Sequence, residues 1–160
     1  APTGITFGLK HVFGDAVRCF FVEPVEAPCV ALGLMTGFPP DVSVYEIGLT
    51  NATEADGLAV ATPSRLIGPC ARALVSGCVT VTDDELLRAL YLLDATERIR
   101  VEPSAAAGVA AVARVLSGAD GAEAMGPCGA QVAWTTGGLF VPSDEYEAFR
   151  ARGEALLSQP

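Results

Sequence analysis

Residues 133–138, Ala-Trp-Thr-Thr-Gly-Gly, are the stretch around which this chain is organised. The residues just before them, 130–134, are largely apolar and end in a β-forming aromatic, which predicts a buried strand. Two threonines and two glycines follow at once, so hydroxyls stand at the end of that strand beside backbone that can approach a ligand closely. Ligands of open α/β sheets bind at the carboxyl ends of the strands. The alternative is a strand-to-helix turn with no ligand.

The composition indicates a globular domain. The 160 residues are enough for one domain with one core, and 51% hydrophobic against 18% charged residues argues against disorder. Apolar content at this level also indicates surface that is buried against something outside the chain. We expect no membrane partner, because no apolar run reaches the length of a membrane span. The first residues show no signal-peptide pattern.

The charge and the cysteines narrow the class of protein further. A formal net charge of −9, with only ten lysines and arginines, disfavours nucleic acid as a partner. No cysteine belongs to a CxxC pair, so we expect reduced thiols, mostly in the core, and a cytoplasmic protein. The five cysteines are Cys19, Cys29, Cys70, Cys78 and Cys128.

Apolar spacing along the chain predicts that strands alternate with helices. This alternation implies an α/β fold with a mostly parallel sheet, right-handed crossovers and helices on its faces. The capping box at residues 82–85, Thr-Asp-Asp-Glu, is a specific start signal for one of the helices. Strands are expected at 17–22, 78–81, 99–101 and 130–134, and helices at 5–13, 28–35, 65–76, 86–98, 105–116 and 143–157.

Three of the expected strands end in polar turn residues, which predicts a pocket. These ends are 23–24 (Glu-Pro), 102–104 (Glu-Pro-Ser) and 135–137 (Thr-Thr-Gly), and the carboxyl ends of parallel strands meet at one edge of a sheet. The helix start near Gly4 offers free N–H groups that suit an anion. Glu23 and Glu102 could act as a carboxylate pair in acid–base chemistry. Alternatively, each caps its following helix or binds a cation.

Several kinds of site are excluded. The single histidine, His11, and the single lysine, Lys10, both lie in the first expected helix. A zinc site or a Ser-His-Asp triad needs more residues than the chain supplies, and it contains neither a P-loop nor GxGxxG. The chain thus has the features of a site for an anionic cofactor without the reactive residue that would use it.

Five segments of the chain resemble the carboxyl-terminal part of the D-serine dehydratase (D-serine ammonia-lyase) family. Their order and approximate spacing match along essentially the whole chain. Asp-Gly-Leu-Ala-Val at 56–60 and Glu-Pro-Ser-Ala at 102–105 occur more widely in fold-type-II pyridoxal-phosphate enzymes. Cys-Phe-Phe at 19–21 and Trp-Thr-Thr-Gly-Gly at 134–138 are more specific to this family. The segments are 2–10, 19–29, 51–60, 100–108 and 132–142.

The resemblance implies a fold like the large-domain half of fold-type-II enzymes, similar to the tryptophan synthase beta chain. It implies that residues 1–160 are the carboxyl-terminal portion of a pyridoxal-phosphate-dependent catalytic domain. The Schiff-base lysine and most of the glycine-rich phosphate loop would lie upstream, so the chain would hold no catalytic residue of its own.

The resemblance also implies which residues bind the cofactor, pyridoxal 5'-phosphate. Thr136 matches the residue whose hydroxyl meets the pyridine nitrogen, although the sequence does not decide between Thr135 and Thr136 for the residue that faces the ring. Gly137 and Gly57 would lie close to the cofactor. The tail of the phosphate loop would be residues 3–4, where Thr3 stands in place of a glycine usual in the family and Gly4 follows it.

A cation site is implied as well. Glu23, with carbonyl groups around Ala27 and Cys29, matches a site seen in relatives, and oxygen ligands suit a hard cation, monovalent or divalent. Because Cys29 stands where some relatives have an acid, we expect the ion to be monovalent or absent.

The implied function is part of an enzyme that converts D-serine to pyruvate and ammonia by β-elimination. The 160 residues alone are expected to be inactive. The expected partners are the amino acid substrate, the missing amino-terminal part of the same enzyme and, through self-association, a second copy. The alternatives are a non-catalytic α/β domain that binds a small ligand or partner, and a fragment of another fold-type-II lyase such as a threonine dehydratase relative. Substrate stereochemistry rests on the resemblance alone.

Overall fold

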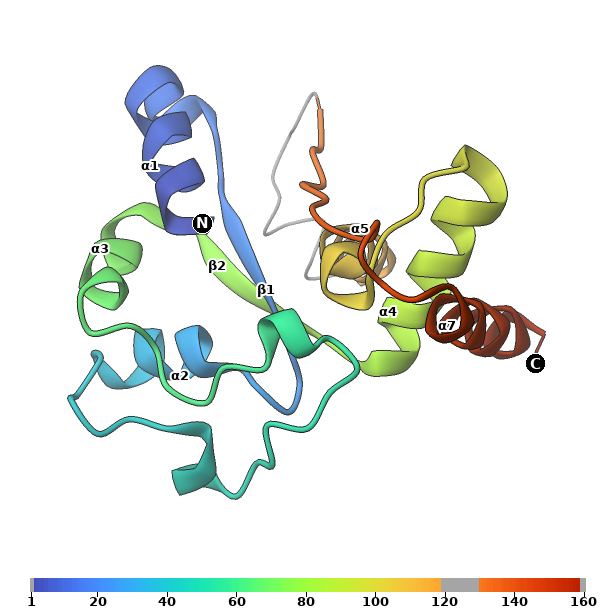
Figure 1. Cartoon of the computed structure of the whole chain (residues 1–160). Coiled ribbons are helices and arrows are strands. Elements are labelled where there is room, and N and C mark those ends of the chain that lie inside the picture. Colours follow the sequence, from blue (N-terminus) through green and yellow to red (C-terminus); the bar gives the residue numbers. More distant parts are fainter. Residues whose placement is uncertain (1, 119–129, 159–160) are drawn as a thin grey trace. The chain divides into compact units, whose positions relative to one another are not determined.

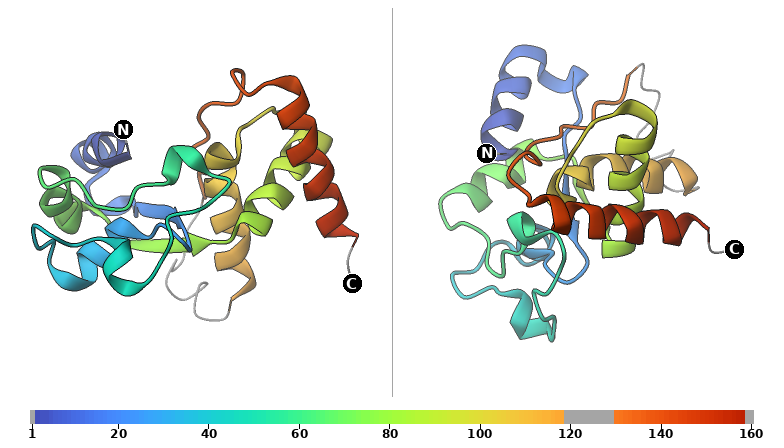
Figure 2. Two further views of the ribbon diagram at one scale, coloured as in Figure 1. Left: turned by 60° about the horizontal axis from the view of Figure 1, so that its bottom comes forward. Right: turned by 45° about the vertical axis from the view of Figure 1, so that its right-hand side comes forward.

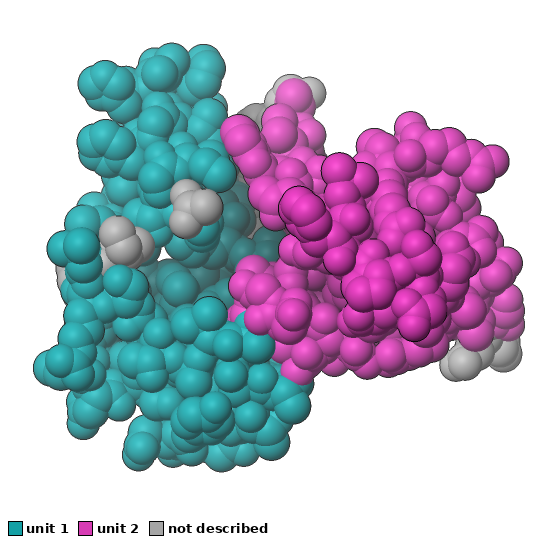
Figure 3. Space-filling model, viewed as in Figure 1, with its two compact units in different colours: residues 1–52, 59–80 teal, residues 53–58, 81–160 magenta. Residues whose placement is uncertain are grey.

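A computed structural model describes residues 2–118 and 130–158 of the chain. The chain divides into two compact units, which we describe separately (Figure 3). Unit 1 comprises Ala1–Ala52 and Ala59–Thr80, and unit 2 comprises Thr53–Leu58 and Val81–Pro160.

Unit 1 is built on a two-stranded parallel sheet of β1 (Phe20–Pro24) and β2 (Gly77–Val81), the last residue of which is counted with unit 2 (Figure 1). The β-forming run 20–22, Phe-Phe-Val, explains β1, and Pro24 ends it. The strands are joined at their start, where the N–H of Ser76 donates to the carbonyl of Cys19 at 2.7 Å. The helices are α1 (Pro2–Phe13), α2 (Cys29–Thr36) and α3 (Ile67–Leu74), with short 3-10 turns η1 (Gly14–Ala16) and η2 (Val44–Ile47).

Unit 2 is helical. Helix α4 packs against both α5 and α7, as both views in Figure 2 show. The apolar residues Leu86, Leu87 and Leu90 of α4 are fully buried in this core. The elements are η3 (Asp56–Leu58), α4 (Asp83–Leu92), a π-turn η4 (Leu93–Glu97), α5 (Pro103–Ser117) and α7 (Ser143–Leu157).

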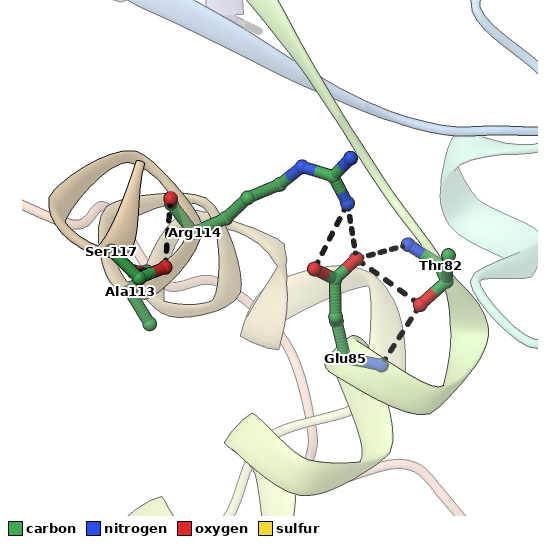
Figure 4. Close-up of polar contacts among 5 residues, drawn as sticks. All are labelled: Thr82, Glu85, Ala113, Arg114 and Ser117. Atoms are coloured by element: carbon green, nitrogen blue, oxygen red, sulfur yellow. Dashed lines mark hydrogen bonds and ion pairs between the residues drawn. The ribbon is translucent and has the colours of Figure 1, made fainter. Parts of the chain in front are cut away.

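The predicted capping box at the start of α4 is confirmed (Figure 4). The hydroxyl of Thr82 accepts the N–H of Glu85 at 3.2 Å, and the carboxylate of Glu85 accepts the N–H of Thr82 at 2.7 Å. The same carboxylate accepts hydrogen bonds from Nη1 of Arg114 on α5, with both oxygens at 2.9 Å. One carboxylate therefore ends the exposed N–H groups of α4 and joins α4 to α5.

The α/β class with a parallel sheet is confirmed, but two of the four expected strands are wrong. Residues 99–101 and 130–134 form no regular structure. A strand needs a neighbour that pairs with its N–H and C=O groups, and within the described residues only β1 and β2 pair in this way. None of the helices in the described ranges combines the length and the apolar character that a membrane span needs.

Candidate functional site

The turn that ends the sequence stretch quoted first, residues 135–138, has an unusual backbone. Gly137 and Gly138 both have positive φ, +47° and +134°, which side chains rarely allow. A Cβ on Gly138 would lie 2.6 Å from the Cα of Val101, so the backbone of this segment touches that of the segment before α5. We call residues 135–138 the threonine–glycine turn.

The two predicted glycines of unit 2 converge on one carboxylate. A Cβ on Gly137 would lie 2.5 Å from Oε1 of Glu102, and a Cβ on Gly57 would lie 3.9 Å from the same oxygen. The N–H of Gly57 donates to Oγ of Ser104 at 3.1 Å and to Oδ1 of Asp56 at 2.7 Å. The side chain of Glu102 makes no capping bond to α5, so helix capping does not describe it.

The threonine–glycine turn faces a hollow of about 420 Å³, a size within the range of small-ligand pockets. Thr135 and Thr136 are both exposed, so their hydroxyls are not sealed in the core. An open hollow, two exposed hydroxyls and a glycine without Cβ fit a cofactor that the backbone approaches closely. The lining residues are Ile99, Arg100, Val101, Thr135, Thr136, Gly137, Leu139 and Phe140.

The residues predicted for the phosphate loop lie in unit 1. Thr3 and Gly4 belong to the first turn of α1, where N–H groups lack helical acceptors. Thr3 is 9% exposed, whereas a Cβ on Gly4 would meet nothing within 4 Å. An anion at this helix end would therefore have free access beside Gly4.

Glu23, the predicted cation ligand, caps α2. Its carboxylate accepts the N–H of Val30 at 2.7 Å and that of Ala31 at 2.9 Å. Burial raises the pKa of this carboxyl above its ordinary value, while these two N–H groups and the thiol of Cys29 act in the opposite direction. Helix capping, one of the alternatives in the sequence analysis, is thus what Glu23 does in the structure.

The other two predicted cation ligands lie beside Glu23. Cys29 is buried, and burial together with the charge of Glu23 raises the pKa of its thiol to about 12. The carbonyl of Ala27 accepts the N–H of Cys29 at 3.0 Å. Within the described residues, no three His, Cys, Asp or Glu side chains are grouped so as to hold a metal. The cation site stays a prediction.

The thiols match the expectation of reduced cysteines. Cys19, Cys29, Cys70 and Cys78 are free, and burial with the charge of Glu23 raises the pKa of Cys78 to about 12. Cys19 and Cys29 are buried, while Cys70 is exposed. Cys128 lies outside the described residues.

The expected meeting of three strand ends holds in part. The segments 102–104 and 135–137 come together with Gly57 in unit 2, whereas Glu23, Thr3 and Gly4 belong to unit 1. The sequence analysis gave no role to Arg100, which lines the hollow. A single charge inside the apolar triplet 99–101, Ile-Arg-Val, was the available signal.

Comparison with known proteins identifies relatives along almost the whole chain. The family model "Pyridoxal-phosphate dependent enzyme" matches residues 1–125. A probable D-serine dehydratase of Chromobacterium violaceum is 47% identical over 98% of this chain, and one of Geobacillus stearothermophilus is 49% identical over 95%. The chain spans only 36% and 35% of the length of these two proteins.

Solved structures give the same fold. A bacterial threonine deaminase, from the organism abbreviated T.th., is 26% identical, with a TM-score of 0.59 over 70% of this chain and 38% of its own. A threonine deaminase of Solanum lycopersicum matches 96% of this chain and 39% of its own with a TM-score of 0.69. At 18% identity this second likeness concerns the fold alone.

Proposed function

This chain belongs to the pyridoxal-phosphate dependent enzyme family, and from that premise we propose that it is the carboxyl-terminal portion of the catalytic domain of a D-serine ammonia-lyase. The observation that carries the proposal is the 47–49% identity to probable D-serine dehydratases over 95–98% of the chain. The proposed reaction converts D-serine to pyruvate and ammonia by β-elimination.

Pyridoxal phosphate, when bound, supplies an electron sink for the bonding electrons that are released at the substrate Cα. In our proposal the hydroxyl of Thr136 meets the pyridine nitrogen. A neutral hydroxyl, unlike a carboxylate, does not hold a proton on that nitrogen, which favours elimination over transamination. Gly57 and Gly137 allow the backbone to approach the ring, because neither has a Cβ.

The phosphate would be held by the N-terminus of α1. N–H groups at the start of a helix bind phosphate through hydrogen bonds and the helix dipole. Gly4 leaves open space there, and Thr3 adds a hydroxyl to the same turn. Glu23, Ala27 and Cys29 would support a cation, monovalent or divalent, next to the start of α2.

The proton-transfer groups would lie in the rest of the enzyme. Lys10 is the only lysine of this chain, and it pairs with Asp15 at 3.7 Å. We therefore propose that the 160 residues alone are inactive and need the amino-terminal part as a partner. Several large apolar side chains are exposed, among them Phe140 at 99% and Leu139 at 85%, and their burial would favour such an assembly. Self-association and a cytoplasmic location stay part of the proposal.

A hybrid enzyme tests this function. In it, residues 1–160 replace the matching segment of the Chromobacterium violaceum relative. We expect the hybrid to form pyruvate from D-serine and the isolated chain to form none. Thr136→Ala should lower kcat about tenfold, because a hydrogen bond to the cofactor is lost, and the matched Thr135→Ala should leave it nearly unchanged.

The substrate identifies the class of lyase. A hybrid that binds pyridoxal phosphate but acts on L-threonine and not on D-serine would replace our proposal by a threonine dehydratase, the activity named for the solved structure at 26% identity. A folded hybrid that binds no pyridoxal phosphate would instead favour a non-catalytic binding domain.

A further inference from the structure

We propose that Arg100 is a positioning residue that holds the threonine–glycine turn in place. The consequence for the cofactor rests on the proposed function, whereas the positioning itself concerns only contacts within unit 2. Arg100 lies in the segment before α5 and contacts the chain on the far side of the turn at two separate places.

The first contact is made by the backbone. A Cβ built on Gly138 would lie 2.8 Å from the carbonyl oxygen of Arg100 and 2.6 Å from the Cα of Val101. The turn therefore rests directly on the main chain at residues 100–101, with no side chain between them.

The second contact is made by the guanidinium. Its Nη2 donates to the carbonyl of Val141 at 2.9 Å, and its Cζ lies 4.1 Å from the centre of the Tyr146 ring. Tyr146 is 3% exposed in the first turn of α7, and its N–H donates to the carbonyl of Pro142 at 2.9 Å. The side chain thus ties residues 141–142 to α7.

These contacts fix both ends of a short segment. Residues 138 and 141 are held by the same arginine, while Leu139 and Phe140 between them are exposed. The turn that precedes Gly138 carries Thr136, so the position of its hydroxyl depends on how firmly Gly138 is held. Arg100 also lines the hollow that Thr135 and Thr136 face.

Packing alone does not explain this arginine. Its Nε is buried and has no hydrogen-bond partner in the described part of the structure, and an unsatisfied buried donor lowers stability. What the guanidinium provides is geometry, because its planar fork stacks on a ring and donates to a carbonyl at the same time. A lysine has the charge but not the fork.

The test compares Arg100→Lys with Arg152→Lys. Arg152 is a matched control, because it lies on α7, pairs with Glu54 and is half exposed. In the 160-residue chain, chymotrypsin cleavage after Phe140 reports on the held segment, and cleavage after Phe13, which is 56% exposed in unit 1, is the internal reference.

We expect Arg100→Lys to speed cleavage after Phe140 about tenfold without changing cleavage after Phe13, and Arg152→Lys to change neither. In the hybrid enzyme, Arg100→Lys should raise the dissociation constant for pyridoxal phosphate about tenfold, as measured by equilibrium dialysis. Combined with Thr136→Ala it should add little, because both changes act on the same hydroxyl.

Two results would overturn the proposal. One is cleavage after Phe140 that stays at the parent rate. The other is cleavage that rises equally at Phe13, since this indicates a general loss of stability. A hybrid that binds no pyridoxal phosphate with Arg100 intact would count against the proposed function, while the cleavage rates still decide the positioning.

Discussion

Gly138 rests on the main chain of Val101, whose Cα would lie 2.6 Å from a Cβ at residue 138. Its neighbour Gly137 meets a softer surface, because a Cβ there would lie 2.5 Å from the carboxylate at the flexible end of Glu102. Both glycines have positive φ. They therefore differ in whether the neighbouring atoms can move away.

This difference predicts an order of stabilities. Gly138→Ala should cost about 3 kcal/mol or more, since backbone must shift, and Gly137→Ala about 1–2 kcal/mol, mostly from the left-handed backbone. Gly14→Ala is the control, with φ +54° and nothing within 4 Å of its Cβ. Urea unfolding measures all three. Equal losses at 137 and 138 would show that the main chain at 101 gives way as easily as a side chain.

The crossing of α4 and α7 depends on Gly153. A Cβ there would lie well inside van der Waals contact with the carbonyl oxygen of Leu87 and 2.9 Å from the Cβ of Tyr91. We expect Gly153→Ala to cost about 1–3 kcal/mol, because the two helices must separate. Gly8→Ala in α1, where the added methyl meets nothing within 4 Å, should instead stabilise by about 0.5–1 kcal/mol. Thermal unfolding of both variants checks the pair, and a loss at Gly8 as large as that at Gly153 would contradict it.

Glu23 should make stability depend on pH in an unusual direction. Burial raises its pKa, so the folded chain binds this proton more tightly than the unfolded chain. The resulting stability is present below the ordinary pKa of 4.5 and is lost as the pH rises through the higher folded value. Relative to the parent, Glu23→Gln should therefore gain stability between pH 4 and pH 7, as measured by urea unfolding.

Glu26 provides a control of opposite sign. The hydroxyl and the N–H of Thr50 donate to its carboxylate at 2.7 and 3.1 Å, and they lower its pKa. Glu26→Gln should therefore lose stability relative to the parent as the pH rises over the same range. Parallel curves for the two variants would show that the environment of Glu23 does not favour its protonated form.

Local signals in the sequence predicted the helices well. The helix at 143–157 has the predicted bounds, and the capping box of Thr82 and Glu85 forms as expected. Such features depend on residues a few positions apart, so the sequence contains all that determines them.

The strands depend on partners that sequence patterns do not identify. Phe20–Pro24 and Gly77–Val81 found each other, whereas the apolar runs at 99–101 and 130–134 pair with nothing in the described residues. In the candidate site, the type of residue at Gly57 and Gly137 could be predicted, but their common neighbour Glu102 and the role of Arg100 follow only from three-dimensional packing.

The short segment 53–58 belongs to unit 2, although unit 1 flanks it in the sequence on both sides. Its Thr53 hydroxyl and Glu54 N–H donate to the two oxygens of Asp83 at 2.5 and 3.1 Å, in the first turn of α4. A gene divided after codon 80 would thus leave one product with six residues whose acceptors are gone, and the other with a carboxylate that has lost its donors. The two halves are interlaced along the polypeptide, and neither can be expressed intact as a continuous piece.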